Sequence, residues 1–481
     1  MKDAALLALD QGGHGSRALL FDGAGRLLHT ARRPVAETRP APERVEQDPL
    51  ELAATLRECA EEAAAAARRL GLAVTAAALA TQRSSLCCWD RATAEPLSPV
   101  LSWQDRRNAD FMAEQAREAQ EIRRRTGLPP SPHYGAAKLR WCLDHLPAVA
   151  AARRAGRLCA GPLAAWLLAA LLEERPCAAD AVNASRTLLW NLHTGDWDPW
   201  LLERFGIPRD ILPRAADDCG PFGHLALDGE RVPLALCTGD QAAALFAWGP
   251  PPGDEVEVNA GTGAFASLAL AAPRAERHGL LLSVIHRCRD EVRHALEGTV
   301  NGAASALDRV MADEGLDPGT AWARLDRWLD EETTPPLFLN GVGGLGAPFW
   351  RPGFPSRFIG GGNAPARLVA VVESIVFLLG EILERMPLAE HGVRRIRISG
   401  GLAALDGLCR RLAAVSGLPV ARARQCEATA QGAARLAAAV AGGDGGWPEF
   451  HPERVFTPEP DPGLERRREA WREALHRALE R

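Results

Sequence analysis

Three short glycine turns, each directly after an apolar run, contain the residues of this chain that are best suited to bind phosphate. They lie at residues 10–16, 261–263 and 400–401. Because glycine has no side chain, the main-chain N–H groups of such turns can approach phosphate oxygens closely. The third turn is expected to begin a helix, whose N-terminus would add partial positive charge. Each turn alone could be a plain chain reversal, but together the three predict a nucleotide phosphate chain held between two domains.

Two carboxylates follow apolar runs at points where they could take part in chemistry. Asp10 comes directly after residues 6–9, and an acid in that position can hold Mg²⁺ beside a phosphate. Asp240 follows the run 234–237 and comes just before an expected helix, residues 242–248. It could act as a general base that accepts a proton from a substrate hydroxyl. The alternative for Asp240 is a helix N-cap, because Asp is a good capping residue.

Polar and aromatic side chains also follow the expected strands of the first half, at Arg83, Trp103, Asp105 and Arg106. Ligands bind at the strand ends of open α/β sheets. Arg83 could therefore hydrogen-bond sugar hydroxyls, and Trp103 could pack on a carbon chain. The alternative is a surface ion pair and a buried tryptophan.

One glycine-rich segment imitates a dinucleotide-binding motif. Residues 341–346 read G-V-G-G-L-G, which fits the spacing of that fingerprint. The fingerprint requires a helix directly after the glycines. Residues 347–352, A-P-F-W-R-P, cannot begin a clean helix, so the sequence argues against an NAD site here.

Length, composition and charge limit the class of protein. A chain of 481 residues is too long for one ordinary hydrophobic core, so two or more domains are expected. The net charge of -5 gives no reason to expect nucleic acid or an anionic membrane surface as a partner. The apolar stretches, such as 163–172, are too short to span a bilayer, and the N-terminus leaves no room for a signal peptide.

The eleven cysteines follow no pattern. Their only close pair is Cys87–Cys88, and no CxxC motif occurs. Such a set predicts reduced thiols in a cytoplasm rather than disulfides or a zinc site.

Around the first turn, the pattern predicts three short strands, followed by a polar loop at 34–48 and a helix at 49–70. Further helices are expected at 109–125, 138–146 and 160–173. After Pro250, Pro251, Pro252 and Gly253 the opening pattern returns, with a strand at 255–259, a glycine turn and a returning strand at 264–269. This internal repeat predicts two domains of one architecture facing each other, at 1–249 and 250–481.

The motifs found so far resemble those of the FGGY carbohydrate kinases, and among them the glycerol kinases most closely. The matching segments keep the family's order over nearly the whole chain. They include LALDQG (7–12), SRALLFD (16–22), RVEQDP (44–49), TQR (81–83), SWQDRR (102–107), GDQAAALF (239–246), GTGAF (261–265), LEGTV (296–300) and SGG (399–401). Each segment is weak evidence alone, but the ordered set is specific.

The resemblance implies an α/β fold of two ribonuclease-H-like domains, of the actin, hexokinase and Hsp70 type, with an ATP cleft between them. It implies ATP and Mg²⁺ as cofactors, with Asp240 as the base and Asp10 on the metal. ATP would lie mostly on the second domain, and a small polyol or sugar deep on the first. The implied nucleotide-binding residues are Gln11, Gly12, Gly13, His14, Arg17, Gly261, Thr262, Gly302 and Gly401. The implied substrate-binding residues are Gln82, Arg83, Ser84, Trp103, His133, Tyr134, Asp240 and Gln241.

Five positions depart from the glycerol kinase pattern, among them Leu405, near which an adenine-contacting asparagine of those enzymes aligns. Gly13 and His14 stand where those enzymes have two threonines, Ser84 replaces a glutamate, and His133 aligns with a tyrosine. Two alternatives therefore remain open beside a glycerol-kinase-like activity. One is a catalytically weak homologue that binds nucleotide or sugar as a regulator, and the other is a kinase for a different sugar, such as a ketose or pentitol. A homo-oligomer is possible in each case.

Overall fold

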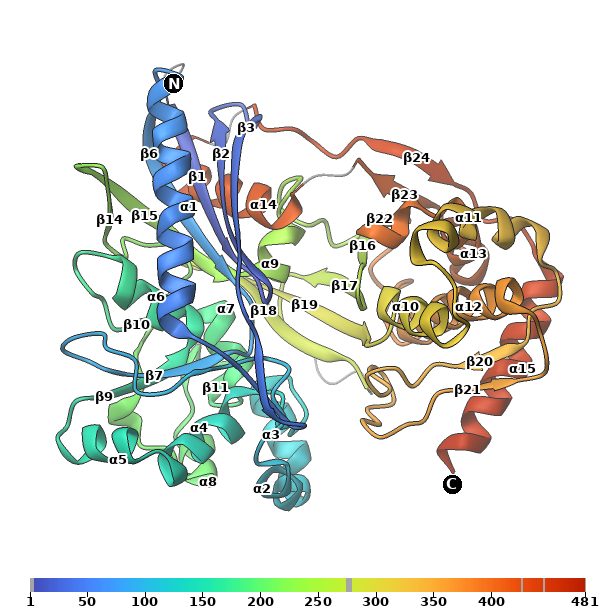
Figure 1. The fold of residues 1–481 in the computed structure, drawn as a ribbon, viewed down its shortest axis with the longest axis horizontal. Helices are drawn as coiled ribbons and strands as arrows, with labels where there is room; N and C mark the ends of the chain where they lie inside the picture. The colour runs from blue at the N-terminus through green and yellow to red at the C-terminus, as the bar shows by residue number, and fades with distance from the viewer. Residues whose placement is uncertain (1–3, 274–278, 425–426, 444–445, 481) are drawn as a thin grey trace.

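The computed structural model describes residues 4–273, 279–424, 427–443 and 446–480, and it consists of two α/β halves (Figure 1). The first half is built on a sheet in the order β14-β15-β6-β1-β2-β3. Its strands are β1 (Ala4–Gln11), β2 (Gly15–Asp22), β3 (Leu27–Pro34), β6 (Ala73–Thr81), β14 (His224–Leu227) and β15 (Glu230–Gly239). β1, β2 and β3 form an antiparallel meander, while β6 runs parallel to β1 and to β15.

The second half repeats this arrangement. Its sheet has the order β18-β19-β17-β16-β22-β23-β24. The strands are β16 (Glu255–Ala260), β17 (Ala264–Leu270), β18 (Leu281–Cys288), β19 (Glu291–Val300), β22 (Arg395–Ser399), β23 (Val420–Ala423) and β24 (Pro452–Phe456). β16 pairs antiparallel with β17 and parallel with β22, as β1 does with β2 and β6. The two-domain α/β fold implied by the resemblance is confirmed.

Helices pack on the sheets along apolar stripes. α1 (Pro49–Arg69) begins where the Asp48 carboxylate accepts the N–H of Leu50 at 2.8 Å, and it packs against β2 and β3. α12 (Ala364–Leu383), buried along nearly its whole length, is the central helix of the second half. It contacts α10 (Ala304–Asp313), α11 (Pro318–Glu331) and α13 (Asp406–Ser416).

One helix of the second half covers the sheet of the first. α14 (Ala428–Val440) packs against β1, β6 and β15, with Ala430 and Ala434 among the buried side chains at this contact. One face of the first-half sheet is therefore covered by a helix that lies almost two hundred residues later in the chain (Figure 1). The domain limits 1–249 and 250–481 remain a prediction.

The remaining elements lie around these two sheets. In the first half they are α4 (Gly135–His145), α5 (Pro147–Arg154), β10 (Ala178–Asp180), α7 (Ala181–Ala184), η2 (Ser185–Thr187), β11 (Trp190–Asn191), β12 (Asp196–Trp197), α8 (Pro199–Phe205), η3 (Arg209–Ile211), β13 (Arg214–Ala216) and α9 (Asp240–Leu245). In the second half they are β20 (Leu337–Leu339), β21 (Arg357–Ile359), η4 (Gly401–Ala404) and α15 (Pro462–Leu479). Within the described ranges, no helix combines the length and the apolar character that crossing a bilayer requires.

The polar segment 34–48, predicted as a loop, contains two strands. β4 (Thr38–Ala41) and β5 (Arg44–Gln47) join β7 (Leu86–Asp90), β8 (Val100–Leu101) and β9 (Leu158–Pro162) in a five-stranded sheet. β5 pairs with β8, which lies far along the chain. Pairing of this kind leaves no local signal, because the two buried positions of β5 are Val45 and the polar Gln47, which give no apolar/polar alternation in the sequence.

Two predicted helices are divided. Residues 109–125 form α2 (Ala109–Glu114), η1 (Gln115–Glu118) and α3 (Ala119–Thr126), because buried Gln115 bonds to both Phe111 and Arg204 where the chain turns. Residues 160–173 begin in β9, and only after Pro162 does the helix α6 (Leu163–Leu171) start.

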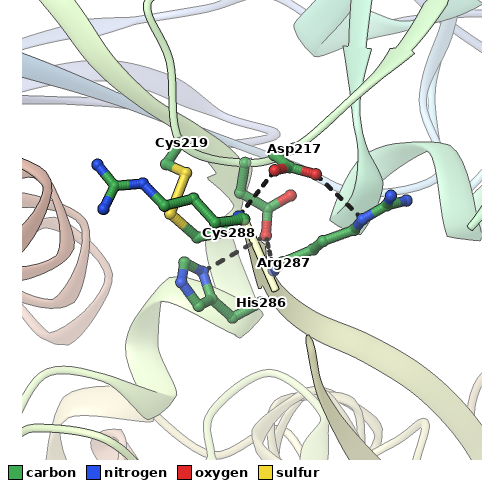
Figure 2. The surroundings of a disulfide bond; sticks show 7 residues. Asp217, Cys219, His286, Arg287 and Cys288 are labelled. Atoms are coloured by element: carbon green, nitrogen blue, oxygen red, sulfur yellow. Dashed lines mark hydrogen bonds and ion pairs between the residues drawn. A yellow bond between two sulfur atoms is a disulfide. The ribbon is translucent and has the colours of Figure 1, made fainter. Parts of the chain in front are cut away.

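The prediction of reduced thiols is wrong for one pair, because Cys219 and Cys288 form a disulfide (Figure 2). It joins the segment after β13 to the end of β18. The Asp218 carboxylate accepts the N–H of Arg287 at 2.7 Å beside it, and Arg287 forms an ion pair with Asp217 at 3.0 Å. The two cysteines are 69 residues apart, and only the crossing of β18 towards the first half brings them together.

Candidate active site

The first glycines lie in the β1–β2 turn, just after Asp10. Asp10 is buried at the end of β1. The N–H of Gly12 donates to the carbonyl of Gly15 at 3.0 Å, so it is not free, contrary to the prediction. The N–H groups of Gly13 and His14 have no partner among the described residues, and His14 is exposed. These two amides are the ones that the turn can offer to an anion.

Asp10 is paired with Arg17 on β2, whose Nη1 also donates to Glu427 at 2.7 Å. Burial raises the pKa of Asp10, and Arg17 opposes that shift. Glu427 comes directly before α14, and the sequence reasoning missed it. No group of three or more potential metal ligands occurs in the parts of the chain that the structure describes. Asp10 alone still fits Mg²⁺, which proteins often hold through one or two carboxylates together with substrate phosphates.

Asp240 is the first residue of α9, and Gly239 occupies the cap position. The Asp240 carboxylate accepts the N–H of its neighbour Gln241 at 2.6 Å and does not cap the helix. The alternative of an N-cap is therefore wrong. Burial raises the pKa of Asp240 to about 6; Arg83 opposes the shift and Asp10 adds to it. A carboxyl group with this pKa can accept a proton near neutral pH.

Arg83 connects Gln241, the residue after Asp240, to the second half. Its guanidinium donates to the side-chain oxygen of Gln241 and to Glu297, which lies on β19. Arg186 in η2 contacts the other oxygen of Glu297 at 3.3 Å. Burial alone would raise the pKa of Glu297, but Arg83 and Arg186 lower it. Sequence reasoning missed Glu297 and Arg186, although the segment LEGTV at 296–300 contains the glutamate.

Gln82 and Trp103 lie beside the first glycine turn. A Cβ atom on Gly13 would lie 3.6 Å from the Gln82 side-chain oxygen and 3.6 Å from Trp103 Nε1. Gln82 donates to Gln47 at 2.7 Å, but its own oxygen is buried without a partner among the described residues. Ser84 Oγ is equally buried and unpartnered there. Buried polar atoms of this kind need a hydrogen-bonding ligand or water.

The rings of His133 and Tyr134 lie next to Trp103 and form one aromatic wall with it. The rings of Trp103 and His133 are 6.0 Å apart, and those of His133 and Tyr134 are 4.9 Å apart. Buried Lys138 donates to the carbonyls of Ser84 (2.8 Å) and His133 (2.7 Å), which ties the two segments together. Burial, together with neighbouring cations such as Arg106, holds the pKa of His133 well below its usual range. His133 is therefore a neutral ring in this wall.

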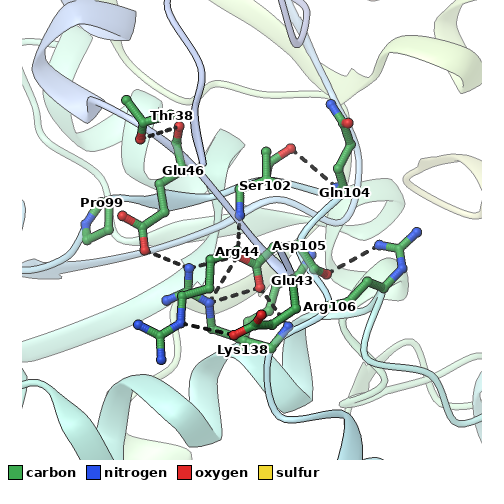
Figure 3. Close-up of polar contacts among 12 residues, drawn as sticks. Thr38, Glu43, Arg44, Glu46, Pro99, Ser102, Gln104, Asp105, Arg106 and Lys138 are labelled. Atoms are coloured by element: carbon green, nitrogen blue, oxygen red, sulfur yellow. Dashed lines mark hydrogen bonds and ion pairs between the residues drawn. The ribbon is translucent and has the colours of Figure 1, made fainter. Parts of the chain in front are cut away.

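The segment that follows Trp103 is anchored by polar contacts around the buried Asp105 (Figure 3). Asp105 binds Arg107 at 2.7 Å and accepts the N–H of Val45 at 2.8 Å. Arg107 also reaches Glu46 at 2.6 Å, so β5 and the segment 102–107 are joined. Trp103 itself is 38% exposed. The alternative of a surface ion pair and a buried tryptophan is wrong on both counts.

The glycine turns of the second half differ from each other. The N–H of Gly261 donates to Gly263 at 2.9 Å, while the N–H groups of Thr262 and Gly263 have no partner within the described ranges. The carbonyl of Gly302 accepts from Asn340 at 2.8 Å in the adjoining loop.

Gly400 has a φ of +92°, and a Cβ there would lie 2.5 Å from the Ala260 carbonyl oxygen, so only glycine fits. The predicted helix does not begin at this turn. The four-residue η4 follows, and α13 starts at Asp406.

A cleft of about 780 Å³ lies between the halves. Its lining includes Arg17, Asp240, Gln241, Glu297, Gly400 and Gly401. The structure thus brings the base candidate of the first half and the third glycine turn of the second half to one space. The remaining predicted residues lie outside this lining, on or beside the glycine turns and around the rings of Trp103, His133 and Tyr134.

Residues 5–247 match the N-terminal domain of the FGGY family of carbohydrate kinases, and residues 256–441 match its C-terminal domain. The chain belongs to the FGGY family of carbohydrate kinases. It is therefore a kinase, and members of this family use ATP as the phosphoryl donor. The glycines at 341–346, whose spacing imitates a dinucleotide-binding motif, are followed by a turn at 347–349 and not by a helix.

Two relatives agree with this assignment, and two solved structures share the fold. This FGGY kinase is 36% identical to a glycerol kinase of Alkalilimnicola ehrlichii over 492 residues, which cover 98% of each chain. It is 32% identical to a glycerol kinase of Burkholderia cenocepacia, with coverage of 99% and 98%. In fold it resembles the crystal structure of Plasmodium falciparum glycerol kinase with ADP, with a TM-score of 0.87, 22% identity and coverage of 99% and 98%. It also resembles the xylulose kinase of Rhodospirillum rubrum, with a TM-score of 0.86, 21% identity and coverage of 99% and 100%.

Proposed function

We propose that this FGGY kinase transfers the γ-phosphoryl group of Mg-ATP to a hydroxyl of a small polyol or sugar, with Asp240 as the general base. The observation that carries the proposal is the partly buried Asp240 carboxylate in the lining of the cleft between the halves, where desolvation raises its pKa to about 6. Such a group is ionised at neutral pH and still basic enough to accept the proton of an attacking hydroxyl.

The first half supplies the acceptor side of this reaction. The side-chain oxygens of Gln82 and Ser84 are buried without partners among the described residues and would accept hydrogen bonds from substrate hydroxyls. Arg83 and Gln241, joined by a hydrogen bond, would orient the reacting hydroxyl next to Asp240. Trp103, with its ring beside His133, offers an apolar face for the carbon chain.

The phosphates would lie between the turns. The amides of Gly13 and His14 in the first half, and of Thr262 and Gly263 in the second, point to an anion-binding role because they lack partners among the described residues. Asp10 would hold Mg²⁺, which spreads the charge of the phosphates when bound. Arg17 would approach the same phosphates while it keeps Asp10 in place. Closure of the halves would exclude water that otherwise hydrolyses ATP.

The residues of the acceptor pocket also support a second class of substrate. Ser84 and His133 replace residues that line the acceptor pocket in glycerol kinases, and the Ser84 hydroxyl is left unpartnered in a buried place. A ketose or pentitol, with more hydroxyls than glycerol, is therefore the second candidate. The cytoplasmic location and a homo-oligomer remain predictions.

A coupled assay of ADP release with a panel of glycerol, pentitols and ketoses tests the proposal. Saturable, Mg²⁺-dependent ADP release with one class of acceptor would support it and identify the substrate. Thermal stabilisation by nucleotide or sugar without turnover with any acceptor would instead favour a regulator and overturn the proposed reaction. The variant Asp240→Asn, with Asp228→Asn as a control at an exposed turn, connects the activity to the base.

A further inference from the structure

Glu297 belongs to the second half, but its carboxylate binds two arginines of the first. Its Oε1 accepts hydrogen bonds from Nη1 and Nη2 of Arg83, each at 3.3 Å, and its Oε2 accepts from Nη1 of Arg186 at 3.3 Å. Each of the three side chains is at most 7% exposed. Buried charges are stable only when they are paired, and loss of one partner leaves the others uncompensated.

Ser283 on β18 holds this carboxylate on its own half. The Ser283 hydroxyl donates to Oε2 of Glu297, and it accepts from Arg186 at 2.9 Å. Because β18 and β19 are adjacent antiparallel strands, Glu297 moves with the second sheet. The far end of the β18–β19 hairpin is tied to the first half by the Cys219–Cys288 disulfide, so a rotation of the second sheet about that end would shift the Glu297 carboxylate relative to Arg83.

Arg83 is fixed at its other end by the residues around Asp240. Its guanidinium donates to Gln241, and its aliphatic part packs on Gly239, where a Cβ atom would lie 2.6 Å from the Arg83 Cγ. Arg186 stacks over the ring of Tyr134 at 5.2 Å, so the second arginine also contacts the aromatic rings beside Trp103.

We propose that Glu297 is a positioning residue that couples the two halves: its carboxylate holds Arg83 against Gln241, so that the acceptor pocket is fully ordered only when the second half is in place. The proposal rests on the proposed function, which places the acceptor on the first half and the nucleotide between the halves. Binding of nucleotide, by drawing the second half in, would then strengthen binding of the acceptor, and linkage makes the effect reciprocal.

The test compares acceptor binding with and without nucleotide. Calorimetry measures the Kd of the acceptor from the same panel that binds most tightly, alone and with Mg²⁺ and adenosine 5′-(β,γ-imido)triphosphate. We expect the nucleotide to tighten acceptor binding by about tenfold in the wild type, and Glu297→Gln to bring that ratio close to one. The matched control Glu291→Gln makes the same change on β19, at an exposed site where the carboxylate pairs with Arg293. It should keep the wild-type ratio.

A ratio in Glu297→Gln equal to that of the wild type would overturn the proposal. If Glu297→Gln does not fold, Glu297→Asp is measured, since it keeps the charge but is one methylene shorter. A reduced ratio in Glu297→Asp supports the proposal, and an unchanged ratio contradicts it. Turnover is a separate readout: a wild-type protein that binds both ligands without releasing ADP would refute the proposed function, while the Kd ratio would still decide the role of Glu297.

Discussion

Asp10 and Arg17 are opposite residues of the β1–β2 hairpin, and their side chains form an ion pair at the end of the hairpin that faces the cleft. Opposite residues of an antiparallel pair project to the same face, so the register itself brings the two charges together. Arg17 also binds Glu427, and Glu427 in turn binds Arg32. The first glycine turn is therefore tied to the start of α14.

Arg17→Gln should weaken the use of Mg-ATP. Burial already raises the pKa of Asp10, and loss of the cation that opposes this shift would raise it further and favour the protonated, metal-free form. We expect the KM for Mg-ATP to rise about tenfold, which steady-state kinetics at neutral pH will measure. Arg32→Gln is the matched control, because Arg32 shares Glu427 but has no contact with Asp10. Equal effects of the two variants would contradict the role given to Arg17.

Asp240→Asn should abolish turnover while it preserves binding. The asparagine keeps the shape of the side chain but cannot take the hydroxyl proton, so kcat should fall by about two to four orders of magnitude. Single-turnover kinetics and equilibrium binding of nucleotide will separate the two effects. Asp228→Asn, at a half-exposed turn, should behave as the wild type. A kcat close to the wild-type value in Asp240→Asn would remove Asp240 from the mechanism.

The pH dependence of kcat/KM should show a rising limb near pH 6. Asp240 works as a base only when it is ionised, and its pKa is raised to about 6 by burial, with Arg83 opposing and Asp10 adding to the shift. Activity is therefore expected to fall as pH decreases through about 6 and to level off above it. A pH profile of kcat/KM for the acceptor measures this. A limb at the pH of an unperturbed aspartate, near 4, would contradict the raised pKa of the Asp240 carboxyl group.

Gly400→Ala should destabilise the second half. The residue has a φ of +92°, and a Cβ atom would lie 2.5 Å from the Ala260 carbonyl oxygen. We expect the free energy of unfolding to fall by about 1–3 kcal/mol, measured by urea denaturation, together with weaker nucleotide binding. Gly361→Ala is the control, because no atom lies within 4 Å of a Cβ at that position and its φ is not positive. Unchanged stability of Gly400→Ala would show that the turn can relax.

The sequence by itself determined the local features. The strand, glycine turn and returning strand at Asp10 and again at Gly261 depend on neighbouring residues, so apolar runs and glycines were sufficient to predict them. The ordered motifs also identified the family, since each motif is short and contiguous. Asp240 could be predicted as a candidate, although not the choice between a cap and a base.

Only the tertiary structure decided what lies together from distant parts of the chain. Glu297 and Arg83 are 214 residues apart, the Cys219–Cys288 disulfide spans 69, and Glu427 reaches Arg17 over 410. Neither spacing nor composition encodes such contacts, because they arise when β18, β19 and α14 cross to the first half. The pKa of Asp240 was also beyond the sequence, since burial and neighbouring charges are properties of the assembled cleft.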